Sequence, residues 1–108
     1  MKYAIIGGTN MESLPIPYRE EVVGTPYGDV VIFRGMLDCG QEVIFRFRHG
    51  VLFRHDPADI NYRANIYAMR MLGVTHIIGL SSVGACDYGF KVGTVCLVND
   101  FIDMTKKR

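Results

Sequence analysis

The chain has 108 residues, of which 49% are hydrophobic and 21% are charged, and its formal net charge is +1. This length suits at most one domain, and the composition is that of a folded domain rather than a disordered chain. Acidic and basic residues are mixed along the sequence and the one basic cluster is the tripeptide at residues 106–108, so we expect no nucleic-acid partner.

The first half of the chain is predicted to contain three strands. Residues 3–6 form a short apolar run that two glycines end, which predicts a buried strand. Residues 10–27 hold all the prolines but one and are predicted to form an irregular loop. Residues 30–34 and 42–48 are predicted to be the two strands of a hairpin, because the linker at 36–40 has the length of a hairpin turn.

A helix is predicted next, between Asp56 and Gly73. Asp56 is expected to cap its start, Pro57 suits its first turn, and Gly73 suits its end. An apolar stripe at helical spacing predicts the side that packs against the sheet. The members of this stripe are Ile60, Ala64, Tyr67, Ala68 and Met71.

Two further strands are predicted in the second half. Residues 75–80 are almost continuously apolar, which is typical of a strand covered on both faces, and residues 94–98 form the last strand. The order strand, helix, strand between Val43 and Leu80 predicts a parallel crossover. One helix covers only one face of such a sheet. Either a partner subunit supplies the other layer, or this chain is the front part of a larger fold.

Donor-rich residues follow three of the predicted strands, namely Thr9, the pair Arg48 and His49, and the pair Ser81 and Ser82. Charge-assisted hydrogen bonds to oxyanions are strong, and an arginine can grip two oxygens at once. Each group taken alone also fits an ordinary turn or an exposed polar pair, and that interpretation stays open for each. Together they predict an anion-binding site at one edge of a sheet.

Several other kinds of site are not favoured by the sequence. The glycines before Thr9 let backbone N–H groups approach an anion, but a dinucleotide fingerprint needs a third glycine and a P-loop needs Gly-Lys-Thr. His49, His55 and Asp56 suggest a metal-dependent phosphohydrolase, but no further ligands follow on later helices. We therefore predict no metal.

The three cysteines and the N-terminal segment bear on the cellular compartment. The cysteines form no C-x-x-C pair, which favours buried free thiols in a reducing compartment over disulfides or a zinc knuckle. The apolar run near the N-terminus is too short for a signal peptide or a membrane span. We expect a cytoplasmic protein with no membrane partner.

Six motifs of the chain resemble those of the 5′-methylthioadenosine and 5′-methylthioinosine phosphorylases, which belong to the trimeric purine nucleoside phosphorylases. The motifs are Ala4-Ile5-Ile6-Gly7-Gly8-Thr9, Thr25-Pro26-Tyr27-Gly28, Arg48-His49-Gly50, Asn61-Tyr62-Arg63-Ala64-Asn65, Gly73-Val74-Thr75-His76-Ile77-Ile78 and Asp100-Phe101-Ile102-Asp103. They occur in the order and with the spacing of that family over essentially the whole chain. The resemblance therefore rests on the set and not on any one tripeptide.

The resemblance implies an α/β fold with a mixed, partly parallel sheet and one long crossover helix, the N-terminal part of a three-layer phosphorylase/hydrolase-like fold. It implies that Thr9, Arg48 and His49 hold the phosphate that attacks the ribosyl C1′, and that Ser81 and Ser82 complete the pocket. The implied reaction is phosphorolysis of a purine nucleoside such as 5′-methylthioadenosine or 5′-methylthioinosine, giving the base and (methylthio)ribose 1-phosphate. It implies inorganic phosphate as co-substrate, no metal or organic cofactor, and a homotrimer.

Members of that family are much longer than this chain, and their purine-reading residues lie in the part that is absent here. We therefore expect residues 1–108 to form a single incomplete domain, the N-terminal portion of a nucleoside phosphorylase domain. The first hypothesis is an enzyme that acts as part of a longer chain or an assembly. The alternative is a non-catalytic remnant that retains the phosphate pocket and acts only by oligomerising or by binding anions.

Overall fold

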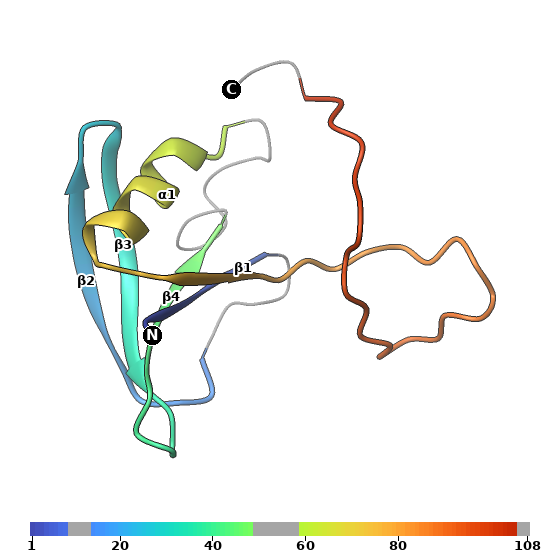
Figure 1. Ribbon diagram of the computed structural model, residues 1–108, viewed down its shortest axis with the longest axis horizontal. Coiled ribbons are helices and arrows are strands. Elements are labelled where there is room, and N and C mark those ends of the chain that lie inside the picture. The colour runs from blue at the N-terminus through green and yellow to red at the C-terminus, as the bar shows by residue number, and fades with distance from the viewer. Residues whose placement is uncertain (9–13, 49–58, 106–108) are drawn as a thin grey trace.

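A mixed five-stranded sheet with one helix against it forms the body of the protein, as the computed structural model shows over residues 1–8, 14–48 and 59–105 (Figure 1). In chain order the elements are β1 (Tyr3–Gly7), β2 (Tyr18–Thr25), β3 (Gly28–Met36), β4 (Glu42–Phe47), α1 (Tyr62–Met71) and β5 (His76–Gly79). The strand order is β2-β3-β4-β1-β5. The predicted fold class, an α/β chain with a partly parallel sheet and a crossover helix, is confirmed.

β1 lies between β4 and β5 and is parallel to both of them. The chain leaves β4, passes through α1 and returns as β5 on the far side of β1, which is the predicted parallel crossover. The backbone pairing continues just past the strands, where the Arg48 N–H donates to the Gly7 carbonyl (2.7 Å) and the Leu80 N–H to the Ile6 carbonyl (2.9 Å). The carboxyl ends of three strands therefore meet at one edge.

β2 corrects the prediction of an irregular loop over residues 10–27. It pairs antiparallel with β3 from Tyr18 opposite Gly35 to Thr25 opposite Gly28. The prolines did not exclude a strand, because Pro26 lies in the two-residue turn between β2 and β3. β2 is an edge strand with Val23 as its one buried residue, so its hydrophobic pattern is weak.

The core lies between α1 and one face of the sheet. Its buried members come from four strands and the helix: Ala4, Val23, Val30, Ile32, Ile44, Ala64, Ala68 and Met69. Ala64 and Ala68 face the sheet as predicted, but Tyr67 and Met71 are 37% and 54% exposed, which corrects the predicted stripe. The two alanines let the helix approach the sheet closely, so their neighbours Asn65 and Met69 are buried instead.

The ends of α1 are set by an asparagine and a glycine. The Asn61 side chain accepts a hydrogen bond from the Ala64 N–H (3.1 Å), so Asn61 is the N-cap and the assignment of that role to Asp56 is wrong. Asp56 itself lies outside the described residues. The predicted end is confirmed, because Gly73 has φ +75°, its N–H bonds the Arg70 carbonyl and the Val74 N–H bonds the Met69 carbonyl.

The part of the chain after α1 differs most from expectation. β5 forms as predicted, but all four of its residues are exposed, so the prediction of cover on both faces is wrong here. Residues 94–98 form no strand, and from residue 80 to residue 105 the chain runs away from the sheet without a helix or strand (Figure 1). A strand needs a neighbour to receive its backbone hydrogen bonds, and this segment has none among the described residues.

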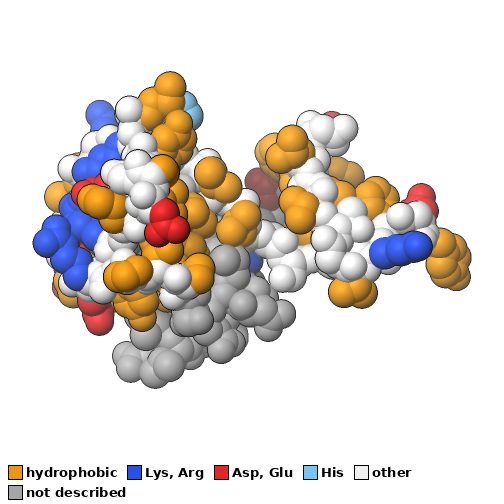
Figure 2. All heavy atoms as spheres, turned by 90° about the horizontal axis from the view of Figure 1, so that it is seen from below, with side chains coloured by type: hydrophobic (Ala, Val, Ile, Leu, Met, Phe, Trp, Pro, Cys, Tyr) orange, Lys and Arg blue, Asp and Glu red, His pale blue; other side chains and the backbone are white. Residues whose placement is uncertain are grey.

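Many hydrophobic side chains of residues 80–105 are exposed, and Figure 2 shows them on the projecting part of the molecule. The three cysteines are free and exposed, which corrects the prediction that they are buried. Cys86 and Cys96 are exposed because the segment that carries them packs against nothing described, and Cys39 lies in the turn between β3 and β4. No helix in the described part of the chain is long and apolar enough to cross a membrane.

Candidate anion-binding site

The Arg48 side chain crosses the carboxyl end of the central strand. Arg48 directly follows β4, and its Nη1 donates a hydrogen bond of 3.0 Å to the Oγ of Ser81, which lies just beyond β5. Because β1 separates β4 from β5, the guanidinium must pass over the end of β1 to reach this serine. Two of the predicted site residues, 33 positions apart in the chain, are therefore in contact.

Gly8, the residue after β1, lies under this guanidinium. A Cβ atom at Gly8 would come within 3.0 Å of the Arg48 Cζ, closer still to its Nη2, and within 3.3 Å of the Leu80 carbonyl oxygen. Gly8 is buried and Arg48 is half-buried. The ends of β1, β4 and β5 thus hold one cation from three directions.

The charge of Arg48 is not neutralised by any described carboxylate. The ion pairs of the described chain are Lys2 with Glu42 and Arg34 with Glu21 and Glu42, all away from this edge. An arginine carries five N–H donors, and Ser81 takes only one of those on Arg48. The arrangement can therefore bind an oxyanion through the remaining donors.

The other predicted site residues are placed as follows. Ser82 is exposed and follows Ser81 at the same edge of the sheet. Thr9 and His49 lie outside the described residues. Beyond Ser81 the chain folds around an open hollow of about 680 Å³, lined mainly by residues 81–86 and 90–94. The candidate site borders this hollow through the two serines.

A second basic residue of β4, Arg46, has a different environment that sequence reasoning missed. Arg46 is 8% exposed, its Nε donates to the Asn65 Oδ1 (3.0 Å) and its Nη1 donates to the Val31 carbonyl (2.9 Å). Burial lowers the pKa of the Arg46 guanidinium. The Nδ2 of Asn65 is buried and has no hydrogen-bond partner. The one available signal was the alternation that puts Arg46 on the same face of β4 as the buried Ile44.

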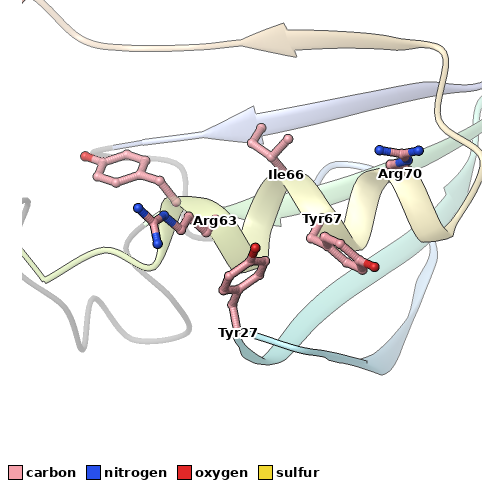
Figure 3. A pocket seen from close by; sticks show the side chains of 6 residues that line it. Tyr27, Arg63, Ile66, Tyr67 and Arg70 are labelled. Carbon is pink, nitrogen blue, oxygen red and sulfur yellow. The ribbon is translucent and has the colours of Figure 1, made fainter. Parts of the chain in front are cut away.

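A separate hollow of about 450 Å³ lies on the outer side of α1 (Figure 3). Its lining residues are Tyr27, Tyr62, Arg63, Ile66, Tyr67 and Arg70. The rings of Tyr27 and Tyr67 meet edge to face at 5.8 Å, which ties the turn between β2 and β3 to the helix. This hollow is formed by α1 and that turn, and none of the strand-end residues lines it.

No group of three or more His, Cys, Asp or Glu side chains in the described ranges is placed to hold a metal ion. The donor set at the strand ends, an arginine and a serine, is also one that binds anions rather than cations.

Comparison with known proteins gives a family match over nearly the whole chain. The family model described as the phosphorylase superfamily matches residues 2–108. A probable S-methyl-5′-thioinosine phosphorylase of Methanocaldococcus jannaschii is 44% identical, over 96% of this chain and 40% of its own length. An S-methyl-5′-thioadenosine phosphorylase of Pyrococcus furiosus is 38% identical, over 99% of this chain and 42% of its own. A 6-oxopurine nucleoside phosphorylase of the same organism is 42% identical.

Solved structures give the same result. A methylthioadenosine phosphorylase from an Antarctic soil metagenomic library superposes with a TM-score of 0.64 at 39% identity, over 72% of this chain and 28% of that one. The methylthioadenosine phosphorylase of Schistosoma mansoni superposes with a TM-score of 0.66 at 30% identity, over 72% and 29%. This chain spans about 40% of the length of the curated relatives it matches.

Proposed function

The chain belongs to the phosphorylase superfamily, and from this membership we propose that it carries the phosphate-binding part of a purine nucleoside phosphorylase. In the proposed reaction an oxygen of inorganic phosphate forms a bond to the ribosyl C1′ while the N-glycosidic bond breaks. The bonding electrons leave with the purine, which takes up a proton. The products are the free base and a sugar 1-phosphate.

The single observation that carries this proposal is the contact between Arg48 and Ser81 across the end of β1. It supports a phosphate site because it leaves a cation, with N–H donors that no described residue takes, at the place where three strands end. Fixed donors of this kind hold a charged nucleophile in one orientation and so lower the entropic part of the barrier. We infer that Thr9, His49 and Ser82 add further contacts to the same phosphate.

The substrate class of the proposal follows the names of the relatives. The nucleosides in those names are 5′-methylthioinosine, 5′-methylthioadenosine and 6-oxopurine nucleosides. We propose a purine nucleoside such as 5′-methylthioadenosine or 5′-methylthioinosine as the substrate, with phosphate as co-substrate and no metal or organic cofactor. We propose that the purine site lies outside residues 1–108 and that this chain is one incomplete domain, which is supported by its covering about 40% of its relatives' length. A homotrimer and a cytoplasmic location complete the proposal.

Two observations favour a second candidate function. The chain spans about 40% of its relatives, and the hydrophobic side chains after β5 are exposed. These facts also fit a non-catalytic remnant that keeps the phosphate pocket and acts by binding anions or by oligomerising. The two candidates agree on the pocket and differ on turnover.

Substitution of Arg48 tests the pocket. Arg48→Ala should weaken inorganic phosphate binding by about 1.5–3 kcal/mol, or roughly 10- to 150-fold, because a charged hydrogen-bond donor is lost. Isothermal titration calorimetry of the purified chain with phosphate measures this change. Arg70→Ala is the matched control, because Arg70 is an exposed arginine on α1, away from the strand ends. Equal phosphate affinity of the native chain and the Arg48 variant would contradict the proposal.

A phosphorolysis assay then separates the two candidates. The chain is incubated with phosphate and either 5′-methylthioadenosine or 5′-methylthioinosine, and the released base is measured by chromatography. Base release that Arg48→Ala abolishes supports the enzyme. Phosphate binding without base release supports the remnant. An intact mass of the natural gene product above that of residues 1–108 would show that the enzyme continues beyond this chain.

A further inference from the structure

We propose that Gly8 is a positioning residue, whose missing side chain provides the space in which the Arg48 guanidinium lies. This inference rests on the proposed function only in taking phosphate as the anion that Arg48 binds. The sequence suggests a different role for Gly8, namely close approach of its backbone N–H to an anion. In the structure the space beside its Cα is occupied by Arg48.

The space beside the Cα of Gly8 is too small for a side chain while Arg48 keeps its position. A Cβ at Gly8 would lie 3.0 Å from the Arg48 Cζ and nearer still to Nη2, which is closer than carbon atoms of side chains approach other groups. On its other side that Cβ would lie 3.3 Å from the Leu80 carbonyl oxygen. Leu80 cannot move aside easily, because its N–H is bonded to the Ile6 carbonyl at 2.9 Å. The guanidinium is therefore the group that a side chain at position 8 would displace.

A positive φ, the usual reason for a glycine, does not apply at Gly8. The described glycines with positive φ are Gly28, Gly40, Gly73 and Gly93, and Gly8 is not among them. Its backbone conformation is thus one that other residues adopt without strain. The need for glycine at this position comes from the neighbouring side chain and not from the backbone.

Arg48 is also held by two hydrogen bonds, one from its side chain and one from its backbone. Its Nη1 donates to the Ser81 Oγ at 3.0 Å, and the backbone N–H of Arg48 donates to the Gly7 carbonyl at 2.7 Å. The guanidinium therefore lies between Gly8 and Ser81, held by contacts within the chain itself. A donor that is already ordered loses less conformational entropy when it binds its ligand. Gly8 would in this way contribute to phosphate affinity without touching phosphate.

The test compares Gly8→Ala with Gly79→Ala. Gly79 ends the neighbouring strand β5, and a Cβ there would have no atom within 4 Å, so it is a matched control at the same edge. We expect Gly8→Ala to weaken inorganic phosphate binding roughly tenfold or more, the lower end of the effect of losing Arg48 itself. Gly79→Ala should change the affinity less than about twofold, as expected of a substitution without a new contact.

A double-mutant cycle distinguishes positioning from general damage. If Gly8 acts through Arg48, Gly8→Ala should have no further effect on phosphate binding in a chain that already carries Arg48→Ala. An equal loss in both backgrounds would overturn the proposal. If Gly8→Ala binds phosphate as tightly as the native chain while Arg48→Ala does not, the role of Gly8 is wrong and the phosphate site stands. If neither variant affects binding, the proposed function of the site fails as well.

A measurement on the native chain covers the case in which Gly8→Ala does not fold. The Nε–H NMR signal of Arg48 should show restricted rotation of the guanidinium in phosphate-free buffer. The exposed Arg70 should rotate freely in the same sample. Free rotation of Arg48 before phosphate is added would overturn the proposal, whatever the variants do.

Discussion

Arg46 lies in β4 and Arg48 directly follows that strand, yet the two side chains have different surroundings. Arg46 is buried and donates hydrogen bonds to Asn65 and to the Val31 carbonyl, which link β4 to α1 and β3. Arg48 reaches past Gly8 to Ser81, which takes one of its five N–H donors. The sequence shows two arginines in alternation, and only their surroundings separate the buried one from the one for which we propose a role in anion binding.

The hydrogen bonds of Arg46 predict how its substitution affects stability. Arg46→Met removes the donors to the buried Asn65 Oδ1 and to the partly buried Val31 carbonyl, and should lower the free energy of unfolding by about 1–3 kcal/mol, the cost of leaving such groups unsatisfied. Urea denaturation followed by circular dichroism measures the loss. Arg63→Met, at an exposed position of α1, is the control and should change stability by less than about 0.5 kcal/mol.

Asn65 provides the second half of this experiment. Its Nδ2 is already unpartnered, so replacing both groups with apolar ones removes several buried polar atoms at once. The double variant Arg46→Met, Asn65→Leu should lose less stability than the sum of the two single variants. Strict additivity would show that the 3.0 Å bond between the two side chains contributes nothing.

Among the elements, the antiparallel strands β2, β3 and β4 are linked by ion pairs of Arg34 with Glu21 and Glu42. The Nε of Arg34 on β3 hydrogen-bonds Glu21 on β2 at 2.5 Å, and its Nη1 bonds Glu42 on β4 at 2.8 Å. The hydrogen bond from Arg34 holds the pKa of the Glu21 carboxyl below its ordinary value of 4.5. The edge strand β2 has one buried residue, and the ion pair between Glu21 and Arg34 adds a pH-dependent link to the rest of the sheet.

This link predicts how stability depends on pH. A carboxyl whose pKa is lower in the folded state stabilises the fold fully above its unfolded pKa, and this contribution is lost as the pH falls through the folded pKa. The urea midpoint of the native chain should therefore fall from the region of pH 4.5 downward. In Arg34→Gln the Glu21 contribution should disappear, so the midpoint should fall less over the same range. Identical pH profiles for the two chains would contradict the assignment.

The family resemblance and the fold class were predicted from the sequence, and both are confirmed. The errors in the fold concern elements whose character depends on neighbours. β2 has a weak pattern because it is an edge strand, and residues 94–98 have a strand-like pattern but no neighbouring strand. A local hydrophobic pattern indicates that a segment can form a strand, but it does not show whether a neighbouring strand is present to pair with it.

The molecule as a whole consists of a packed sheet and helix and a long exposed segment after β5 (Figure 1). The helix α1 packs against one face of the sheet. On its other face the ring of Phe47 contacts those of Phe33 and Phe45, with centroids 5.3 and 5.2 Å apart. The expectation that a further layer completes the fold stays a prediction, in a chain that spans about 40% of the length of its relatives.

The contrast between these two parts predicts the pattern of limited proteolysis. Chymotrypsin should cut first after Tyr88, Phe90 or Phe101, which are 106%, 50% and 81% exposed, because cleavage needs locally unpacked chain. Phe33 and Phe45, 7% and 5% exposed, should be cut only when the sheet unfolds. Mass spectrometry of early fragments measures the order. Early cleavage after Phe45 would show that the sheet is not stable in this chain.

The sequence by itself determined that donor-rich residues end three strands, because apolar runs, glycines and their flanking residues are local features. It thus predicted Arg48 and Ser81 as members of one anion site, and their roles remain a prediction although the structure brings them together. Only the tertiary structure decided that β1 lies between β4 and β5, so that Arg48 must cross Gly8 to reach Ser81. The order of strands in a sheet depends on contacts between distant segments, which no local pattern contains.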